Sequence, residues 1–210
     1  MLRDIRTNYQ KSELTEDSVI KDPFKQLNEW LNAAIKEGDP EPNAMVLSTI
    51  DLKGYPDSRV VLLKELNSEG LIFFTNYNSK KGRQISVNPN VSIVFFWPET
   101  QRQVRIKGKA EKIPDEYSEE YFKSRPVESQ LGAWASPQSR IIESREVLDE
   151  NYSLFQQYFQ DNEILKPAHW GGFIIRPVNF EFWQGRLNRL HDRFEFCLSD
   201  HEWIIHRLAP

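Results

Sequence analysis

The stretch "VSIVFFWPETQRQVRIKGKAEKI" (residues 91–113) is typical of two β-strands joined by a short turn. Its first part, "VSIVFFW" (91–97), is the longest apolar run in the chain. That run has the length of a buried strand, whereas a membrane-spanning helix needs about 20 residues. The second part, "RQVRIKGKAEKI" (102–113), has lysines of the kind that protect solvated strand edges against aggregation. The stretch therefore predicts a β-hairpin.

Similar strand patterns occur on both sides of this hairpin. The other predicted strands are 43–51, 58–67, 71–76, 171–185, 192–198 and 202–208. Many follow one another after short turn signals such as "LKGYP" (52–56) and "NSEG" (67–70). This order favours a mainly β fold, an antiparallel β-barrel with peripheral helices, over a parallel α/β sheet. Since there is no repeat or linker, we expect one domain over residues 1–210, with 1–20 as a flexible N-terminal segment.

One helix is predicted ahead of the first strand, in "DPFKQLNEWLNAAIKEG" (22–38). Asp22 is a candidate N-cap, and Pro23 suits the first helical turn. Gly38 stands where a helix usually stops.

Further helices are predicted between the hairpin and the C-terminal strands. Residues 114–135 are typical of two short helices, the second beginning at Pro126. Residues 136–160 predict one longer helix, with Ser136 as its cap and Pro137 at its first position.

Composition and charge exclude several classes of protein. Hydrophobic residues make up 39% and charged residues 28% of the chain, which is ordinary for a globular domain. The net charge of −4 argues against a protein that coats nucleic acid. Clusters of lysine and arginine on an acidic chain indicate small anions such as phosphates instead. The charged start, "MLRDIRTNYQKSELTED" (1–17), predicts no cleaved secretory signal, and no segment predicts a membrane span.

Several kinds of chemistry have no matching motif. Cys197 is the only cysteine, so we expect no intrachain disulfide and a reducing cytoplasm. Its aromatic surroundings, "FEFCLSD" (194–200), predict a buried, unreactive thiol. The histidines are scattered and there is no HExxH or paired-cysteine pattern, so no metal site is expected. Neither glycine-rich nucleotide motif is present.

Two lysines stand at the start of a predicted helix in "FFTNYNSKKGRQI" (73–85). Ser79 is a plausible cap, which places Lys80 and Lys81 in the first turn. Cations there oppose the helix dipole unless an anion binds to the free N–H groups. The pattern favours an anion site, and an ordinary lysine-rich turn is the alternative.

A second basic segment is "FWQGRLNRLHDRFEF" (182–196). If this segment is extended, Arg189, His191 and Arg193 lie on one face, because side chains of a strand alternate. Such a stripe suits an anion, but it also suits an exposed surface.

Two further motifs carry polar groups suited to phosphate. In "YFKSRPVESQ" (121–130), Tyr121, Arg125 and Ser129 recur every fourth residue and would share one helical face, unless Pro126 interrupts the helix. In the alternative interpretation, Arg125 is a surface residue that pairs with Glu128 or Glu120, and the spacing alone does not decide between the two. In "RVVLLK" (59–64), the two basic ends of the segment fall on opposite faces of a predicted strand.

Taken together, these motifs resemble the pyridoxine (pyridoxamine) 5'-phosphate oxidase family. The matching segments, in family order, are "DPF", "RVVLLK", "FFTNYNSKKGRQI", "RQVRIKGKAEKI", "YFKSRP", "SPQS", "FWQGRLNRLHDR" and "RLAP". The resemblance covers nearly the whole chain, and the "WQGR…RLHDR" block is its most specific part. It implies an FMN-binding split β-barrel and a homodimer with the flavin at the subunit interface. It also implies oxidation of pyridoxine or pyridoxamine 5'-phosphate to pyridoxal 5'-phosphate by O2, with release of hydrogen peroxide.

The resemblance also implies roles for individual residues. The implied FMN-binding residues are Arg59, Val60, Val61, Leu62, Leu63, Lys64, Phe74, Thr75, Lys80, Lys81, Gln103, Gln138, Ser139, Trp183 and Arg193. The implied substrate-binding residues are Lys64, Tyr121, Arg125, Ser129, Arg189, Leu190 and His191. Of these, Arg189 and His191 would be the catalytic residues that orient the substrate. The family often has arginine where Lys80 stands, and lysine lacks the planar fork for a bidentate contact.

Three other interpretations stay open. The nearest is a related split-barrel flavin oxidase of another pathway, such as phenazine biosynthesis, although "YFKSR" with "RLH" favours the pyridoxal-phosphate branch. A protein of another class would bind FMN or pyridoxal phosphate without catalysis. A nucleic-acid-binding barrel is the third, and the acidic charge balance counts against it.

Overall fold

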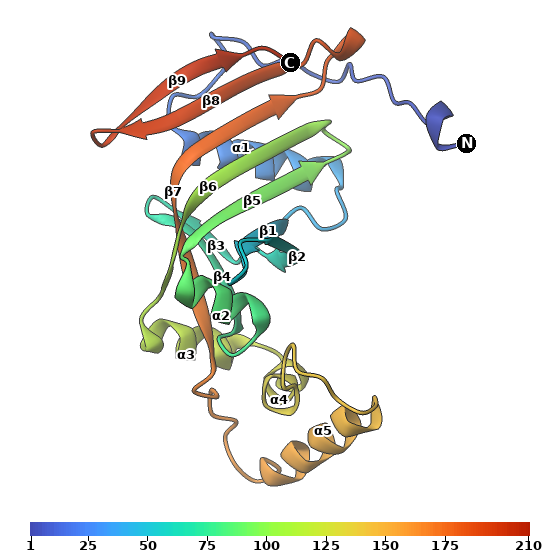
Figure 1. Ribbon diagram of the computed structural model, residues 1–210, viewed down its shortest axis with the longest axis vertical. Coiled ribbons are helices and arrows are strands. Elements are labelled where there is room, and N and C mark those ends of the chain that lie inside the picture. Colours follow the sequence, from blue (N-terminus) through green and yellow to red (C-terminus); the bar gives the residue numbers. More distant parts are fainter.

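The computed structural model describes residues 1–210 and has a mainly β architecture, in which one antiparallel sheet curls around a hydrophobic core (Figure 1). The strands are β1 (Ala44–Ile50), β2 (Pro56–Leu62), β3 (Glu65–Asn67), β4 (Gly70–Asn76), β5 (Asn90–Trp97), β6 (Arg102–Lys112), β7 (Trp170–Gln184), β8 (Asp192–Ser199) and β9 (Glu202–Leu208). Their order is β2-β1-β5-β6-β7-β4-β3, and β8 joins β7 to β9. The predicted hairpin is confirmed, since β5 pairs along its whole length with residues 102–109 of β6.

Five α-helices accompany the sheet. They are α1 (Pro23–Glu37), α2 (Lys80–Val87), α3 (Asp115–Ser124), α4 (Val127–Ala135) and α5 (Glu146–Tyr158), with short 3-10 turns η1 (Leu2–Asp4) and η2 (Leu187–Arg189). Every helix is too short or too polar to cross a bilayer. Helices α3, α4 and α5 gather at one end of the molecule, and β8, β9 and both chain termini lie at the other (Figure 1).

Strand β7 connects these two ends. Its first residues pair with β4, its last residues pair with β8, and β6 runs beside most of it. At about 3.3 Å per residue, Trp170 and Gln184 at its two ends are roughly 45 Å apart along the strand. Side chains near its two ends therefore contribute to different places on the surface.

The core lies between the curled sheet and α1. Phe95, Phe180 and Phe182 are fully buried there. Trp30 of α1 meets Phe182 edge to face, with 5.3 Å between ring centroids, a favourable arrangement for aromatic rings. The buried aromatic residues of the strands thus hold the sheet and α1 together.

The ends of α1 are as predicted. The carboxylate of Asp22 accepts hydrogen bonds from the backbone N–H groups of Phe24 and Lys25. Gly38 ends the helix with φ of 83°, a left-handed conformation that favours glycine.

Two predicted elements differ from the structure. The strand expected over 58–67 is divided into β2 and β3, because the backbone changes partners in between. Leu63 N donates to the carbonyl of Asn43 on one side of the sheet, and Lys64 N donates to that of Ile72 on the other. The chain therefore turns a corner of the barrel at this point.

The helix expected over 136–160 begins only at Glu146. Ser139 has φ of 68°, a left-handed conformation that ends helical geometry, and Arg140 N closes a turn to the Pro137 carbonyl. The two helices expected over 114–135 are confirmed as α3 and α4, with Arg125 in an extended conformation between them.

The segment before α1 follows the edge of the sheet from Tyr9 onward. Gln10 and Lys11 donate their backbone N–H groups to the side-chain oxygen of Gln101, at 2.8 and 3.2 Å. Leu14 is 3% exposed and belongs to the main core. Cys197, expected to be buried, is partly exposed on β8, where Asn179 Nδ2 lies 3.4 Å from its sulfur.

Candidate functional site

A cavity of about 470 Å³ lies beside β2 and β4 and is covered by α3, α4 and the chain between them. It is lined by Val60, Val61, Leu62, Lys64, Phe74, Thr75, Asn76, Lys81, Tyr121, Arg125, Ser129, Gly132, Ala133, Ser136, Gln138 and Trp170. Three of these residues are cations and none is an aspartate or a glutamate. A cavity with that charge balance attracts anionic ligands. We call it the anion pocket.

Lys81 projects into the anion pocket from the first turn of α2. Its Nζ lies 3.2 Å from Thr75 Oγ1 and 3.2 Å from Gln138 Oε1, which are neutral partners. Burial lowers the pKa of Lys81, and the charge of nearby Arg59 lowers it further. An anion in the pocket would offset both effects. The predicted cap of this helix is confirmed, because Ser79 Oγ accepts from Gly82 N.

Arg125 enters the pocket from the α3–α4 connection. Its guanidinium carbon lies 4.7 Å from the centroid of the Trp170 ring, within cation–π distance. Its Nη1 is buried and has no hydrogen-bond partner. Burial also lowers the pKa of Arg125. A buried donor without a partner is costly, so this atom indicates a place for an acceptor group.

Aromatic rings hold the other side of the pocket. Phe74 and Tyr121 stack with 3.9 Å between centroids, and Trp170 lies parallel to Phe74 at 5.4 Å. Tyr121, Arg125 and Ser129 do share the pocket, but they do not share one helix, because the chain is interrupted at Pro126 between α3 and α4, the alternative that the sequence left open. Sequence reasoning missed Trp170, since an aromatic residue at the start of a strand carries no functional signal in a single sequence.

Lys80 and Arg59 lie beside the anion pocket and do not line it. Both pair with Asp57, at 2.8 Å from Lys80 Nζ and 3.2 Å from Arg59 Nη2. The hydrogen bond from Lys80, with one from Gln84, lowers the pKa of Asp57. Arg59 Nη1 also donates to Thr49 Oγ1 at 2.6 Å. The charges of Lys80 and Arg59 are therefore partly balanced within the chain.

Other predicted residues near the pocket have different surroundings. The side chain of Leu63 is buried in the main core and does not face the pocket. Ser139 is exposed in the left-handed turn after Gln138.

The remaining predicted residues lie at the other end of β7, beside a second cavity of about 470 Å³. It is lined by Ile5, Arg6, Thr7, Asn8, Tyr9, Arg186, Leu187, Asn188, Arg189 and His191. Trp183 packs against His191 with 4.5 Å between ring centroids, and Gln103 is its ladder partner on β6. Leu190 is exposed next to this cavity. The predicted site residues thus form two groups, one at each end of β7.

The stripe predicted for 182–196 does not form, because the segment is not one extended strand. Asn188 and Arg189 have φ of 58° and 62° within a 3-10 turn, and β8 begins only at Asp192. Arg193 turns away and pairs with Glu181, at 2.8 Å. Of the three residues of the predicted stripe, Arg189 and His191 line the second cavity and Arg193 does not.

The nine-stranded antiparallel sheet is curled, has helices at one end and carries a cationic pocket beside β2 and β4. These features define a split-barrel protein. Residues 31–157 match the family model described as pyridoxamine 5'-phosphate oxidase. Residues 170–210 match the one described as pyridoxine 5'-phosphate oxidase C-terminal dimerisation region. The chain belongs to the pyridoxine/pyridoxamine 5'-phosphate oxidase family. The family, the split-barrel fold and the class of oxidoreductase implied by the resemblance are thereby confirmed.

Individual relatives agree with this assignment. The chain is 48% identical to a pyridoxine/pyridoxamine 5'-phosphate oxidase of Nostoc sp., over 100% of this chain and 98% of the relative. It is 48% identical to the oxidase of that name from Salinibacter ruber, over 100% and 99% of the two chains. Among solved structures, PhzG from Burkholderia lata, in complex with tetrahydrophenazine-1-carboxylic acid, superposes with a TM-score of 0.88 at 27% identity, covering 94% of this chain and 98% of PhzG.

Proposed function

We propose that this protein oxidises pyridoxamine 5'-phosphate and pyridoxine 5'-phosphate to pyridoxal 5'-phosphate, with FMN as cofactor and O2 as the final electron acceptor. Hydrogen peroxide is the second product. The relatives of 46–49% identity that carry this activity in their names support the choice of substrate. The single cysteine is consistent with work in a reducing cytoplasm.

The observation that carries the proposal is the state of Arg125. Its Nη1 is buried without a partner, in a pocket that has three cations and no carboxylate. A phosphate monoester provides the charge and the acceptor oxygens that such a guanidinium needs. We assign the substrate phosphate to Lys64, Tyr121, Arg125 and Ser129, which all line the pocket.

The same pocket suits FMN. Lys81, whose hydrogen-bond partners are neutral, and Lys80 at the start of α2 would hold the FMN phosphate, with the free N–H groups of the helix directed at it. The flavin would contact two walls of the pocket. One wall consists of Val60, Val61 and Leu62 of β2, and the other of Phe74 and Thr75 of β4. FMN, when bound, accepts a hydride from the substrate and passes two electrons to O2.

A second copy of the chain would complete the site. Six of the predicted residues lie at the end of β7 that is far from the anion pocket, about 45 Å away along the strand. They are Gln103, Trp183, Arg189, Leu190, His191 and Arg193. Within one chain the two groups cannot surround one small molecule. We therefore propose a homodimer with FMN at the interface, in keeping with the description of the C-terminal family model.

The protein's own contribution is orientation. The phosphate-binding residues are remote from the carbon that is oxidised, so their binding energy can align the substrate against the cofactor. Alignment of this kind is worth up to about 7–11 kcal/mol of barrier in well-positioned systems. Arg189 and His191 of the partner subunit would orient the substrate ring from the other side.

An absorption spectrum of the purified protein, followed by anaerobic addition of pyridoxamine 5'-phosphate, tests the function. We expect a flavin band that bleaches on addition and returns with peroxide release when air is admitted. A coloured protein that never bleaches would indicate a binding protein instead. Bleaching only by a reduced phenazine carboxylic acid would indicate a relative of PhzG in function.

A further inference from the structure

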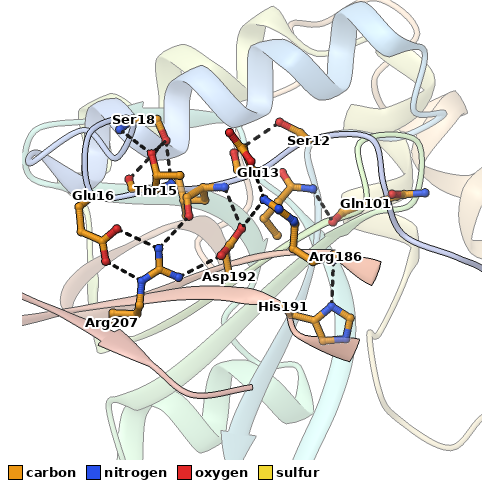
Figure 2. Close-up of polar contacts among 12 residues, drawn as sticks. Ser12, Glu13, Thr15, Glu16, Ser18, Gln101, Arg186, His191, Asp192 and Arg207 are labelled. Atoms are coloured by element: carbon orange, nitrogen blue, oxygen red, sulfur yellow. Dashed lines mark hydrogen bonds and ion pairs between the residues drawn. The ribbon is translucent and has the colours of Figure 1, made fainter. Parts of the chain in front are cut away.

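Asp192, the first residue of β8, connects three separate segments through one carboxylate (Figure 2). Its Oδ2 accepts from Leu14 N and from Arg186 Nη1, both at 3.1 Å, and its Oδ1 accepts from Arg207 Nη1 at 2.9 Å. The side chain is only 14% exposed. Because both oxygens are used and water is largely excluded, the carboxylate has one well-defined position.

Arg186 stands at the start of the turn between β7 and β8, and its side chain contacts Asp192 at the end of this turn. Its side chain reaches forward to Asp192 and to Glu13, at 3.1 and 2.9 Å (Figure 2). The turn in between contains Asn188 and Arg189 in left-handed conformations. Non-glycine residues adopt such conformations where the surroundings enforce them. The pairing of Arg186 with Asp192 is the charged contact that bridges this turn.

The backbone of Arg186 defines the state of His191. Arg186 N donates a hydrogen bond to His191 Nδ1, at 3.1 Å (Figure 2). A ring nitrogen that accepts carries no proton, so a neutral imidazole with this bond has its proton on Nε2. Trp183 packs on the ring at 4.5 Å and Tyr9 at 6.0 Å, which fixes its plane.

Burial, helped by one neighbouring cation, favours the neutral ring of His191. Burial lowers the pKa of His191, and the neighbouring charge of Arg189 lowers it further, against an opposite effect of Asp192. Arg186 holds Asp192 through an ion pair, and Arg207 holds it from the other side. The carboxylate therefore has two arginine partners of its own.

We propose that Asp192 and Arg186 are positioning residues that hold His191 as the tautomer with its proton on Nε2. His191 then presents a hydrogen-bond donor to the second cavity and is not the base that removes a proton from the substrate. The inference rests on the function proposed above, because that function gives His191 its role toward the substrate.

¹⁵N NMR of histidine-labelled, FMN-loaded protein without substrate tests the tautomer directly. The four histidines are distinguished by the signal that disappears in His191→Gln. At neutral pH we expect His191 Nδ1 to resonate as an unprotonated nitrogen and Nε2 as a protonated one. The reverse assignment, or a charged ring, would overturn the proposal.

Two variants test the positioning. In Asp192→Asn and in Arg186→Ala, the turn loses its bridging contact, so we expect mixed tautomers in the His191 signal. We also expect kcat to fall about 10- to 100-fold with bound FMN unchanged, as for other small displacements of reacting groups. Asp192→Glu should recover part of both effects. Unaltered spectra and kcat in both variants would contradict the proposal.

Glu16→Gln is the matched control. Glu16 pairs with the same Arg207 as Asp192 does, at 2.6 Å, but has no contact with Arg186. We expect the His191 signal and kcat to stay as in the wild type, and an effect as large as that of Asp192→Asn would contradict a specific role. The NMR readout needs no turnover, so the predicted tautomer in a protein that does not oxidise pyridoxamine 5'-phosphate would refute the proposed function alone.

Discussion

Arg125 lies over the indole ring of Trp170, 4.7 Å from its centroid, and its buried Nη1 has no hydrogen-bond partner. The ring holds the cation without satisfying its donors. Under the function proposed above, the substrate phosphate would supply the partner that this atom lacks. The unsatisfied donor lowers the stability of the free protein, and it would raise the affinity for a ligand that supplies an acceptor.

Replacing Arg125 by methionine separates these two effects. We expect KM for pyridoxamine 5'-phosphate to rise about 10- to 150-fold, as for loss of a hydrogen bond to a charged group. The unfolding temperature without substrate should stay the same or rise, because an unsatisfied buried donor is removed. Steady-state kinetics and calorimetry on the FMN-loaded protein measure both. Unchanged kinetics would remove Arg125 from the phosphate site.

Trp170 should affect the same kinetic constant through Arg125. A cation–π contact is worth about 0.5–2 kcal/mol, so Trp170→Leu should raise KM roughly 2- to 30-fold. Trp170→Phe, which keeps an aromatic face, should raise it less. Trp134→Phe is the control, since Trp134 packs between α4 and α5 and does not line the pocket. Equal effects of Trp170→Leu and Trp134→Phe would point to general destabilisation.

Lys81 and Lys80 are neighbours with unequal expected effects. Lys80 already has the Asp57 carboxylate at 2.8 Å, whereas the partners of Lys81 are neutral. We expect Lys81→Gln to weaken FMN binding about tenfold or more, and Lys80→Gln to weaken it clearly less. Titration of the FMN-free protein with FMN, followed by flavin fluorescence, gives both constants. A larger loss for Lys80→Gln would reverse the assignment.

The strands and the family were predictable from the sequence because their signals are local. Alternating and apolar runs define β5 and β6, and the motif around Lys80 is contiguous. The shape of the connections was not predictable in the same way. Ser139, Asn188 and Arg189 adopt left-handed conformations that polar residues take only in a suitable tertiary setting. These residues caused the wrong start of α5 and the wrong stripe on 182–196.

The partners of the site residues were also beyond a single sequence. Asp57 and Trp170 were not predicted, because their importance comes from contacts with residues far away in the chain, Lys80 and Arg125. A charged residue or an aromatic one has many structural uses. Their roles become visible only when the pocket is assembled.

The contact between Glu16 and Arg207 should be sensitive to acid. The hydrogen bond from Arg207 lowers the pKa of Glu16 from 4.5 to about 2. A carboxylate with a lowered pKa stabilises the fold fully above its ordinary pKa and loses this effect as pH falls toward the lowered value. We expect the N-terminal segment to stay attached at pH 4.5 and to loosen as pH approaches 2. Pepsin cleavage near buried Leu14, with circular dichroism to follow global unfolding, measures this.

Glu16→Gln serves as the comparison in that experiment. In this variant, the rate at which pepsin cuts the N-terminal segment should change less between pH 4.5 and pH 2 than it does in the wild type. The reason is that no carboxylate is left at position 16 to titrate. The same pH dependence in the variant and the wild type would show that another group governs the release.

Subunit complementation tests the shared site. At a substrate concentration below the wild-type KM, Arg125→Ala and Arg189→Ala should each be nearly inactive as homodimers, because each site then lacks one residue. In a purified heterodimer of the two variants, one site combines both changes and the other has neither, so activity should return to about half of the wild type. The matched control is a heterodimer of Arg125→Ala with Lys64→Ala, whose residues line the same pocket. It should stay inactive, because each of its sites carries one change. If Arg125 and Arg189 served one site within a single chain, the first heterodimer would be as inactive as the second.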